Sequence, residues 1–129
     1  MLPHAFKRIR LNLARSTEFP SGSAQHGYEL IAPLDGDGHL DAKAWHAHRD
    51  QCRVVRFWGD EEHEIGRLVH KPGGQEHARW VFDYDPKDTD DDESGYRLGS
   101  HRFAPGEYVT IHGHGDDHTF RVVSVQSAT

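Results

Sequence analysis

A chain of 129 residues with a formal net charge of −6 is long enough for one domain, and it is too acidic overall to favour nucleic acid as a partner. Cys52 is the single cysteine, so no intramolecular disulfide can form and a reducing compartment is favoured. No apolar stretch approaches the roughly 18 residues of a membrane-spanning helix, and no signal-peptide pattern opens the chain. We therefore expect one cytoplasmic domain, 1–129, without a membrane partner.

Apolar residues alternate with polar ones along most of the chain, which is the period-two pattern of half-buried strands. Ile9, Leu11 and Leu13 give the first example. Turn signals separate such segments about every 8–15 residues, a spacing typical of antiparallel sandwiches and barrels. The pattern predicts strands at 8–13, 28–34, 53–58, 65–70, 78–84, 96–98, 108–112 and 118–125.

One helix is predicted between the second and third strands. Asp41 is a favoured N-cap residue, and Leu40 with Trp45 fits the hydrophobic staple that often accompanies it. The helix is expected over 42–50, with Trp45 anchoring it to the sheet. The Asp-Gly-Asp-Gly turn at 35–38 resembles part of a calcium loop, but its glycine comes too early and no bidentate glutamate follows.

These elements predict a mostly β fold: a small, antiparallel, partly open β-barrel, SH3-like or similar, with one short helix. The acidic stretch at 85–94 interrupts the pattern and is expected to form a mobile, solvated loop, with a divalent cation as the alternative.

Two segments carry a family resemblance. They read GRLVH followed by RWVFDYD, within 66–85, and FAPGEYVTI followed by HTFRVV, within 103–123. They resemble a small uncharacterised bacterial protein family, and this likeness implies no activity. The final hairpin is similar to those that close small SH3-like barrels, and the first segment resembles the β-subdomain at the start of some toxin kinases. Because both patterns are strand–turn–strand, they imply fold rather than function.

Histidine is unusually frequent, with twelve residues in the chain, and three of them gather in the last predicted hairpin. His112 and His118 are expected to face each other across the turn, close enough for both rings to reach one ion. His114, or an aspartate at 116–117, would supply a third ligand for a divalent transition metal. The alternative is a hydrated polar tip, since no HExxH or paired CxxC motif is present.

Aromatic side chains form a second candidate site. Trp80, Phe82 and Tyr84 alternate along one predicted strand, and Trp58 ends another. Such a face predicts either a ligand-binding groove or the core of a small β protein.

Cationic residues gather at the start of the chain, where Lys7, Arg8 and Arg10 lie in a segment without acidic residues. A run of charge of this kind indicates either a solvated strand face or contact with an anionic partner.

The sequence contains no evident catalytic motif. Cys52 fits a small buried residue, because a nucleophile would need a neighbouring histidine and an oxyanion hole. The sequence therefore favours a non-catalytic binding module for a peptide or small ligand. The first alternative is a metal-binding protein or metal-dependent enzyme that uses the hairpin histidines. The second is contact with an anionic partner through the basic first strand.

Overall fold

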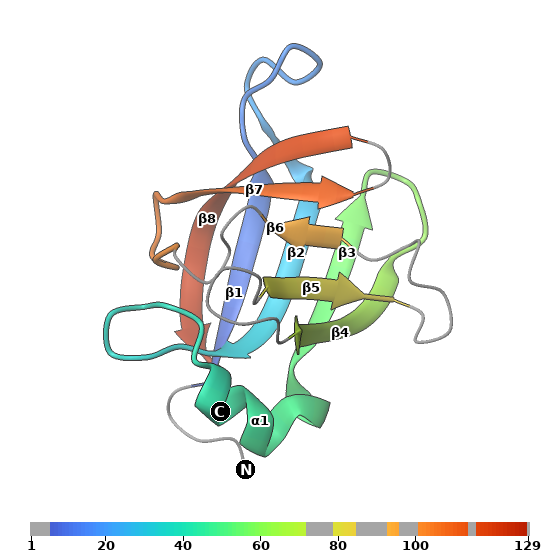
Figure 1. The fold of residues 1–129 in the computed structure, drawn as a ribbon. Helices are drawn as coiled ribbons and strands as arrows, with labels where there is room; N and C mark the ends of the chain where they lie inside the picture. The colour runs from blue at the N-terminus through green and yellow to red at the C-terminus, as the bar shows by residue number, and fades with distance from the viewer. Residues whose placement is uncertain (1–5, 72–78, 85–92, 96–100, 114–115, 129) are drawn as a thin grey trace.

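In the part of the chain that the structure describes, eight antiparallel strands form a ring, with one short helix at one end (Figure 1). This computed structural model describes residues 6–71, 79–84, 93–95, 101–113 and 116–128. The strands are β1 (Phe6–Leu13), β2 (Ser23–Pro33), β3 (Arg53–Trp58), β4 (Glu64–Lys71), β5 (Arg79–Asp83), β6 (Glu93–Gly95), β7 (Tyr108–Gly113) and β8 (Asp116–Ser127). Helix α1 (Ala42–His48) runs into a single 3-10 turn, η1 (Arg49–Gln51).

Each strand pairs with the next one along the chain, and β8 pairs back with β1, so the ladder of strand pairs closes. The closing contact is extensive, since seven residues of β1 have a partner on β8. The ladder is shortest at β6, which has two residue pairs with β5 and two with β7. The predicted antiparallel barrel with one short helix is therefore confirmed, and its last hairpin is β7–β8.

Two parts of the sheet differ from the predicted strands. β2 begins at Ser23, well before the expected 28–34, because the polar residues at its start still pair with β1 and β3. Glu93 and Ser94 were expected in a mobile loop, but they belong to β6 and pair with β5. The rest of that acidic stretch, 85–92, and the expected strand at 96–98 lie outside the described residues.

The inward-facing side chains fill the barrel. An eight-stranded barrel is just wide enough inside to be filled by side chains or to hold one small ligand. Here the rings of Phe82 and Phe120 lie 5.1 and 5.0 Å from the ring of Tyr28, centroid to centroid. The largest fully buried side chains are Phe6, Phe82, Phe120, Ile9, Leu11, Leu30, Leu68, Ile111, Val54, Val109 and Val122. Because these side chains form a packed core, the surface open to a ligand lies at the ends of the barrel and on its outer wall.

Helix α1 covers one end of the barrel (Figure 1). As predicted, Asp41 is its N-cap, and the carboxylate accepts a hydrogen bond from the N–H of Ala44 at 3.1 Å. Trp45 is buried, and its indole N–H donates to the Leu68 carbonyl at 2.7 Å, which confirms its role as the anchor. The α-helix ends at His48 rather than at 50, because residues 49–51 form the tighter 3-10 turn η1.

Candidate functional site

The four aromatic residues predicted to bind a ligand do not share one surface. Trp80 and Phe82 point into the barrel, where they are 5% and 1% exposed. Tyr84 is half-buried just beyond the end of β5, and Trp58 is half-buried at the end of β3. The structure therefore places two members of the set in the core and the other two at separate edges.

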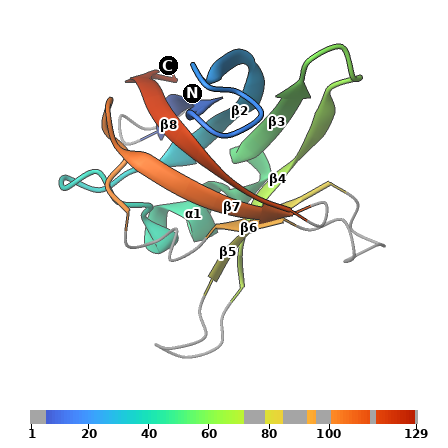
Figure 2. The same ribbon diagram turned by 90° about the horizontal axis from the view of Figure 1, so that it is seen from above.

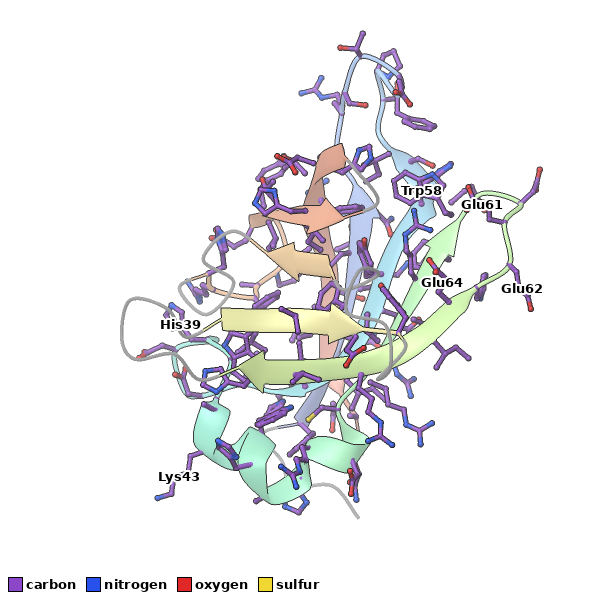
Figure 3. All side chains as sticks on the ribbon, turned by 45° about the vertical axis from the view of Figure 1, so that its right-hand side comes forward. His39, Lys43, Trp58, Glu61, Glu62 and Glu64 are labelled. Carbon is purple, nitrogen blue, oxygen red and sulfur yellow. The ribbon has the colours of Figure 1, made fainter. Side chains whose placement is uncertain are left out.

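Trp58 lies at the barrel end opposite α1, where other rings pack around it (Figure 3). Its indole is 4.7 Å from the His26 ring and 5.1 Å from the His118 ring, centroid to centroid. The guanidinium of Arg56 lies 4.6 Å from the Trp58 centroid and 3.3 Å from a Glu64 carboxylate oxygen. Because these neighbours cover the indole, Trp58 contributes more to closing the barrel end than to an open ligand surface.

The register of the last hairpin separates His112 from His118. His118 pairs with Ile111, whereas His112 pairs with Asp117, so the expected pairing of the two histidines is wrong by one residue. A shift of one residue moves a side chain to the other face of the strand. His118 therefore points toward Trp58, while His112 points outward and its Nδ1 lies 2.6 Å from an Asp117 carboxylate oxygen. These two rings do not converge, and His114 lies outside the described residues.

Within the described part of the chain, Asp35, Asp37 and His39 are the one group of three potential metal ligands that lie close together. Their geometry is explained by a turn, in which an Asp35 oxygen accepts hydrogen bonds from the N–H of Asp37 at 2.8 Å and of His39 at 3.1 Å. The bond from His39, followed by that from Asp37, lowers the pKa of the Asp35 carboxyl. Asp35 and Asp37 are exposed, and the two hydrogen bonds to Asp35 account for the close approach of the three side chains.

The basic first strand is largely engaged with its neighbours. Arg8 and Arg10 approach the Glu29 carboxylate at 3.4 and 3.9 Å. Arg10 also lies 4.4 Å over the Phe57 ring and donates to the Ala24 carbonyl at 3.1 Å. These contacts leave less free positive charge along β1 than the sequence suggests.

Cys52 lies directly before β3 and is fully buried, which confirms the prediction that it is a small buried residue. Burial raises the pKa of its thiol to about 12, which disfavours the reactive thiolate. We expect iodoacetamide at about pH 8 to alkylate the folded protein at least about 100-fold more slowly than the urea-unfolded protein. Mass spectrometry at timed intervals measures both rates, and equal rates would contradict the assignment of an inert core thiol.

His70 packs between Trp45 and Trp80 near α1, with ring centroids 6.1 and 4.6 Å away. Burial, followed by the charge of His46, lowers the pKa of His70. The unfolded chain therefore binds a proton more readily than the folded chain, so this residue's contribution to stability is lost as pH falls below about 6.5.

We expect the urea midpoint to fall between about pH 7.5 and about pH 5.5, and to fall less in His70→Phe, which keeps a ring but cannot titrate. The exposed His63, replaced in the same way, is the matched control. If His70→Phe and His63→Phe show the same pH dependence as the original protein, His70 does not carry the effect.

A broad groove crosses the outer wall where β8 lies between β1 and β7; Figure 2 shows β7 and β8 side by side. Arg121 of β8 pairs with Tyr108 of β7 on one side and with Asn12 of β1 on the other. These three outward side chains form one row across the strands, and Val123 follows Arg121 on the same face. The groove has a volume of about 840 Å³ and is partly open to solvent.

The loop between β1 and β2 forms one wall of this groove. The N–H groups of Ser16 and Gly22 both donate to the Phe19 carbonyl at 2.9 Å, which fixes the loop. Gly22 has a φ of +74°, and a Cβ there would lie 2.7 Å from the Leu13 carbonyl oxygen. Glycine therefore lets the loop fold against the end of β1, and this brings Arg15 to the groove.

The groove combines positive charge with exposed apolar surface. Arg15 and Arg121 line it, and none of its described lining residues is acidic. Neither arginine forms an ion pair with another described residue. Tyr108 is 55% exposed and Val123 is exposed beside it. A ligand that carries both negative and apolar groups would match this surface.

Sequence reasoning missed this groove. Its residues come from 12–24, 108 and 119–123, which meet because β8 pairs with both β1 and β7. The available signal is the alternation along 108–112 and 118–125, which places Tyr108 and Arg121 on the polar face of their strands.

No protein-family model matches the chain, and no curated protein or solved structure shows significant similarity to it. The resemblance to a small bacterial family therefore stays a prediction. Among the described residues, no helix is long and apolar enough to cross a membrane.

Proposed function

We propose that this protein is a non-catalytic binding module that holds an acidic peptide segment of a protein partner in the groove over β1, β7 and β8. The observation that carries the proposal is the row of Asn12, Arg121 and Tyr108 in a groove with a fixed loop as one wall. Arg121 offers several N–H donors for carboxylates, and Tyr108 offers a rigid apolar contact with a polar tip.

The shape of the site favours a peptide over a small molecule. Small-molecule sites are usually concave and bury most of the ligand, whereas the groove is open and the barrel interior is filled by core residues. An extended peptide can lie along an open groove and place alternate side chains on it.

Charge complementarity favours an acidic peptide. Arg15 and Arg121 supply positive charge without an acidic neighbour among the described lining residues, although the whole chain carries a net charge of −6. The described lining residues also include no histidine, cysteine or carboxylate, the groups that most often activate a nucleophile. Such a lining is suited to binding an acidic peptide rather than to catalysis.

The proposal is tested with a short fluorescein-labelled peptide of alternating Glu and Phe residues, titrated at low salt and followed by fluorescence anisotropy. We expect Arg121→Glu to weaken binding about tenfold, which corresponds to about 1.4 kcal/mol. Tyr108→Ala should also weaken binding, and higher salt should weaken binding to the original protein.

The matched control is Lys43→Glu, which makes the same change in charge on α1, at the other end of the barrel (Figure 3). If Arg121→Glu and Lys43→Glu weaken binding equally, the peptide responds only to net charge and the groove is not its site.

A further inference from the structure

Two arginines face each other on the wall formed by β3 and β4. Arg53 of β3 pairs directly with Arg67 of β4. Both side chains point outward and are exposed, while Val54 and Leu68 beside them point into the core. Like charges placed directly opposite each other on neighbouring strands are destabilising. Arginine does not relieve such repulsion by losing a proton, because its guanidinium stays charged in proteins.

The surrounding carboxylates only partly compensate for this pair. Arg67 approaches Asp50 at 3.6 Å, but the two side chains are 63% and 82% exposed, so water and salt weaken the contact. On the other side of β4, Asp83 pairs with Arg67 in the strand register. Arg53 forms no ion pair with another described residue. Arg49 of η1 lines a neighbouring hollow together with Arg67 and adds a third positive charge.

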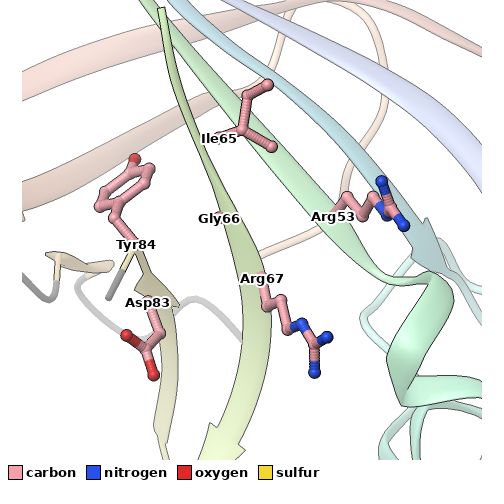
Figure 4. A pocket seen from close by; sticks show the side chains of 6 residues that line it. All are labelled: Arg53, Ile65, Gly66, Arg67, Asp83 and Tyr84. Atoms are coloured by element: carbon pink, nitrogen blue, oxygen red, sulfur yellow. The ribbon is translucent and has the colours of Figure 1, made fainter. Parts of the chain in front are cut away.

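A hollow of about 250 Å³ lies beside the arginine pair (Figure 4). Gly66 also lines the hollow, and Tyr84 and the Asp83 carboxylate lie on the side away from Arg53. A Cβ on Gly66 would lie 2.6 Å from the Asp83 carbonyl oxygen, so this position must stay without a side chain. Ile65, which is 66% exposed, gives the hollow an apolar edge.

We propose that Arg53 and Arg67 bind a phosphate monoester or free phosphate in this hollow. A dianion would neutralise both guanidinium groups at once and offer oxygens to the paired N–H donors of each. The two sources that share this chemistry are inorganic phosphate and a phosphorylated side chain of a partner.

This inference goes beyond the peptide-binding proposal and does not depend on it. The groove lies over β1, β7 and β8, whereas the arginine pair lies on β3 and β4, across the closed ring. Either site can fail its test without affecting the other.

The first test compares melting temperatures in phosphate and in sodium chloride at matched ionic strength. We expect phosphate to raise the melting temperature of the original protein and to leave that of Arg53→Gln unchanged. In dilute phosphate-free buffer, Arg53→Gln should melt no lower than the original protein, and about 2 °C higher if repulsion is fully relieved. The order of the two proteins should therefore reverse on addition of phosphate.

Lys43→Gln, which removes an exposed charge from α1, is the control and should respond to phosphate as the original protein does. A phosphate effect of equal size in Arg53→Gln, or no effect in the original protein, would overturn the proposal. Such a reversal is not expected from a merely structural role of Arg53.

Calorimetric titration then distinguishes the two sources. A short phosphoserine peptide and its unphosphorylated twin are compared with inorganic phosphate. Equal affinity for phosphate and phosphopeptide indicates a free-anion site, and a phosphopeptide that binds at least about tenfold more tightly indicates a phosphorylated partner. Binding of neither, or equal binding of the unphosphorylated twin, would overturn the proposal.

Discussion

Replacing Phe82 with alanine should lower the free energy of unfolding by about 4 kcal/mol, because the structure places this ring in the core. Phe82 is 1% exposed and its ring packs 5.1 Å from that of Tyr28, centroid to centroid. Its removal forfeits the burial of a large apolar side chain and leaves a cavity that a closed barrel cannot easily collapse. Urea unfolding followed by circular dichroism measures the loss.

Tyr108→Ala is the matched control, since it removes another ring of similar size from the outer wall. Its side chain is largely exposed, so the free energy of unfolding should change by no more than about 0.5 kcal/mol. Equal losses in Phe82→Ala and Tyr108→Ala would contradict the assignment of one ring to the core and the other to the surface.

Gly27→Ala should lower the free energy of unfolding by about 3 kcal/mol, an unusually large cost for adding one methyl group. A Cβ on Gly27 would lie 1.9 Å from the Leu11 carbonyl oxygen and 3.1 Å from Cζ of Phe57. The oxygen belongs to the backbone of β1, so the clash is relieved only if β1 and β2 move apart. Gly27 pairs with Asn12, next to the point where the two strands shift register.

Gly36→Ala is the control for this glycine. No heavy atom lies within 4 Å of a Cβ built there, so the change in free energy of unfolding should stay within about 0.5 kcal/mol of zero. The same urea experiment measures both variants. A loss of under about 1 kcal/mol for Gly27→Ala would show that the two strands do not approach each other as described.

Much of the fold could be predicted from the sequence because apolar and polar residues alternate along a strand that has one buried face. Ile9, Leu11 and Leu13 alternate with polar residues and are all buried in β1. Asp41 and Trp45 likewise mark the start and the anchor of α1. The first residues of β2 are mostly polar and partly exposed. They therefore lack the alternation that predicts a strand, although some of them pair with neighbouring strands.

The alternating aromatic residues do not by themselves indicate whether they face a ligand or the core. Trp80 and Phe82 share one side of β5, as predicted, but the alternation does not reveal which of the two that side faces. Closure of the ring places that side inside the barrel. Closure depends on pairing between β1 and β8, at opposite ends of the chain, and no local motif specifies it.

The hairpin histidines show the limit of a prediction that depends on register. His112 and His118 were expected to be partners because they stand symmetrically about the turn, but His112 pairs with Asp117 instead. One residue of shift is enough to put the two rings on opposite faces of the wall. The candidate groove was missed for a related reason, because Asn12, Tyr108 and Arg121 become neighbours only through pairing of distant strands.

The most direct test of the binding groove is a titration of the isotope-labelled protein with the Glu–Phe peptide, followed by amide chemical shifts. We expect the largest shifts on the amides of Asn12, Tyr108, Arg121 and Val123, with little change around Trp58 and Tyr84. Shifts concentrated around Trp58 or Tyr84, or no shifts at a peptide concentration that saturates anisotropy, would contradict it.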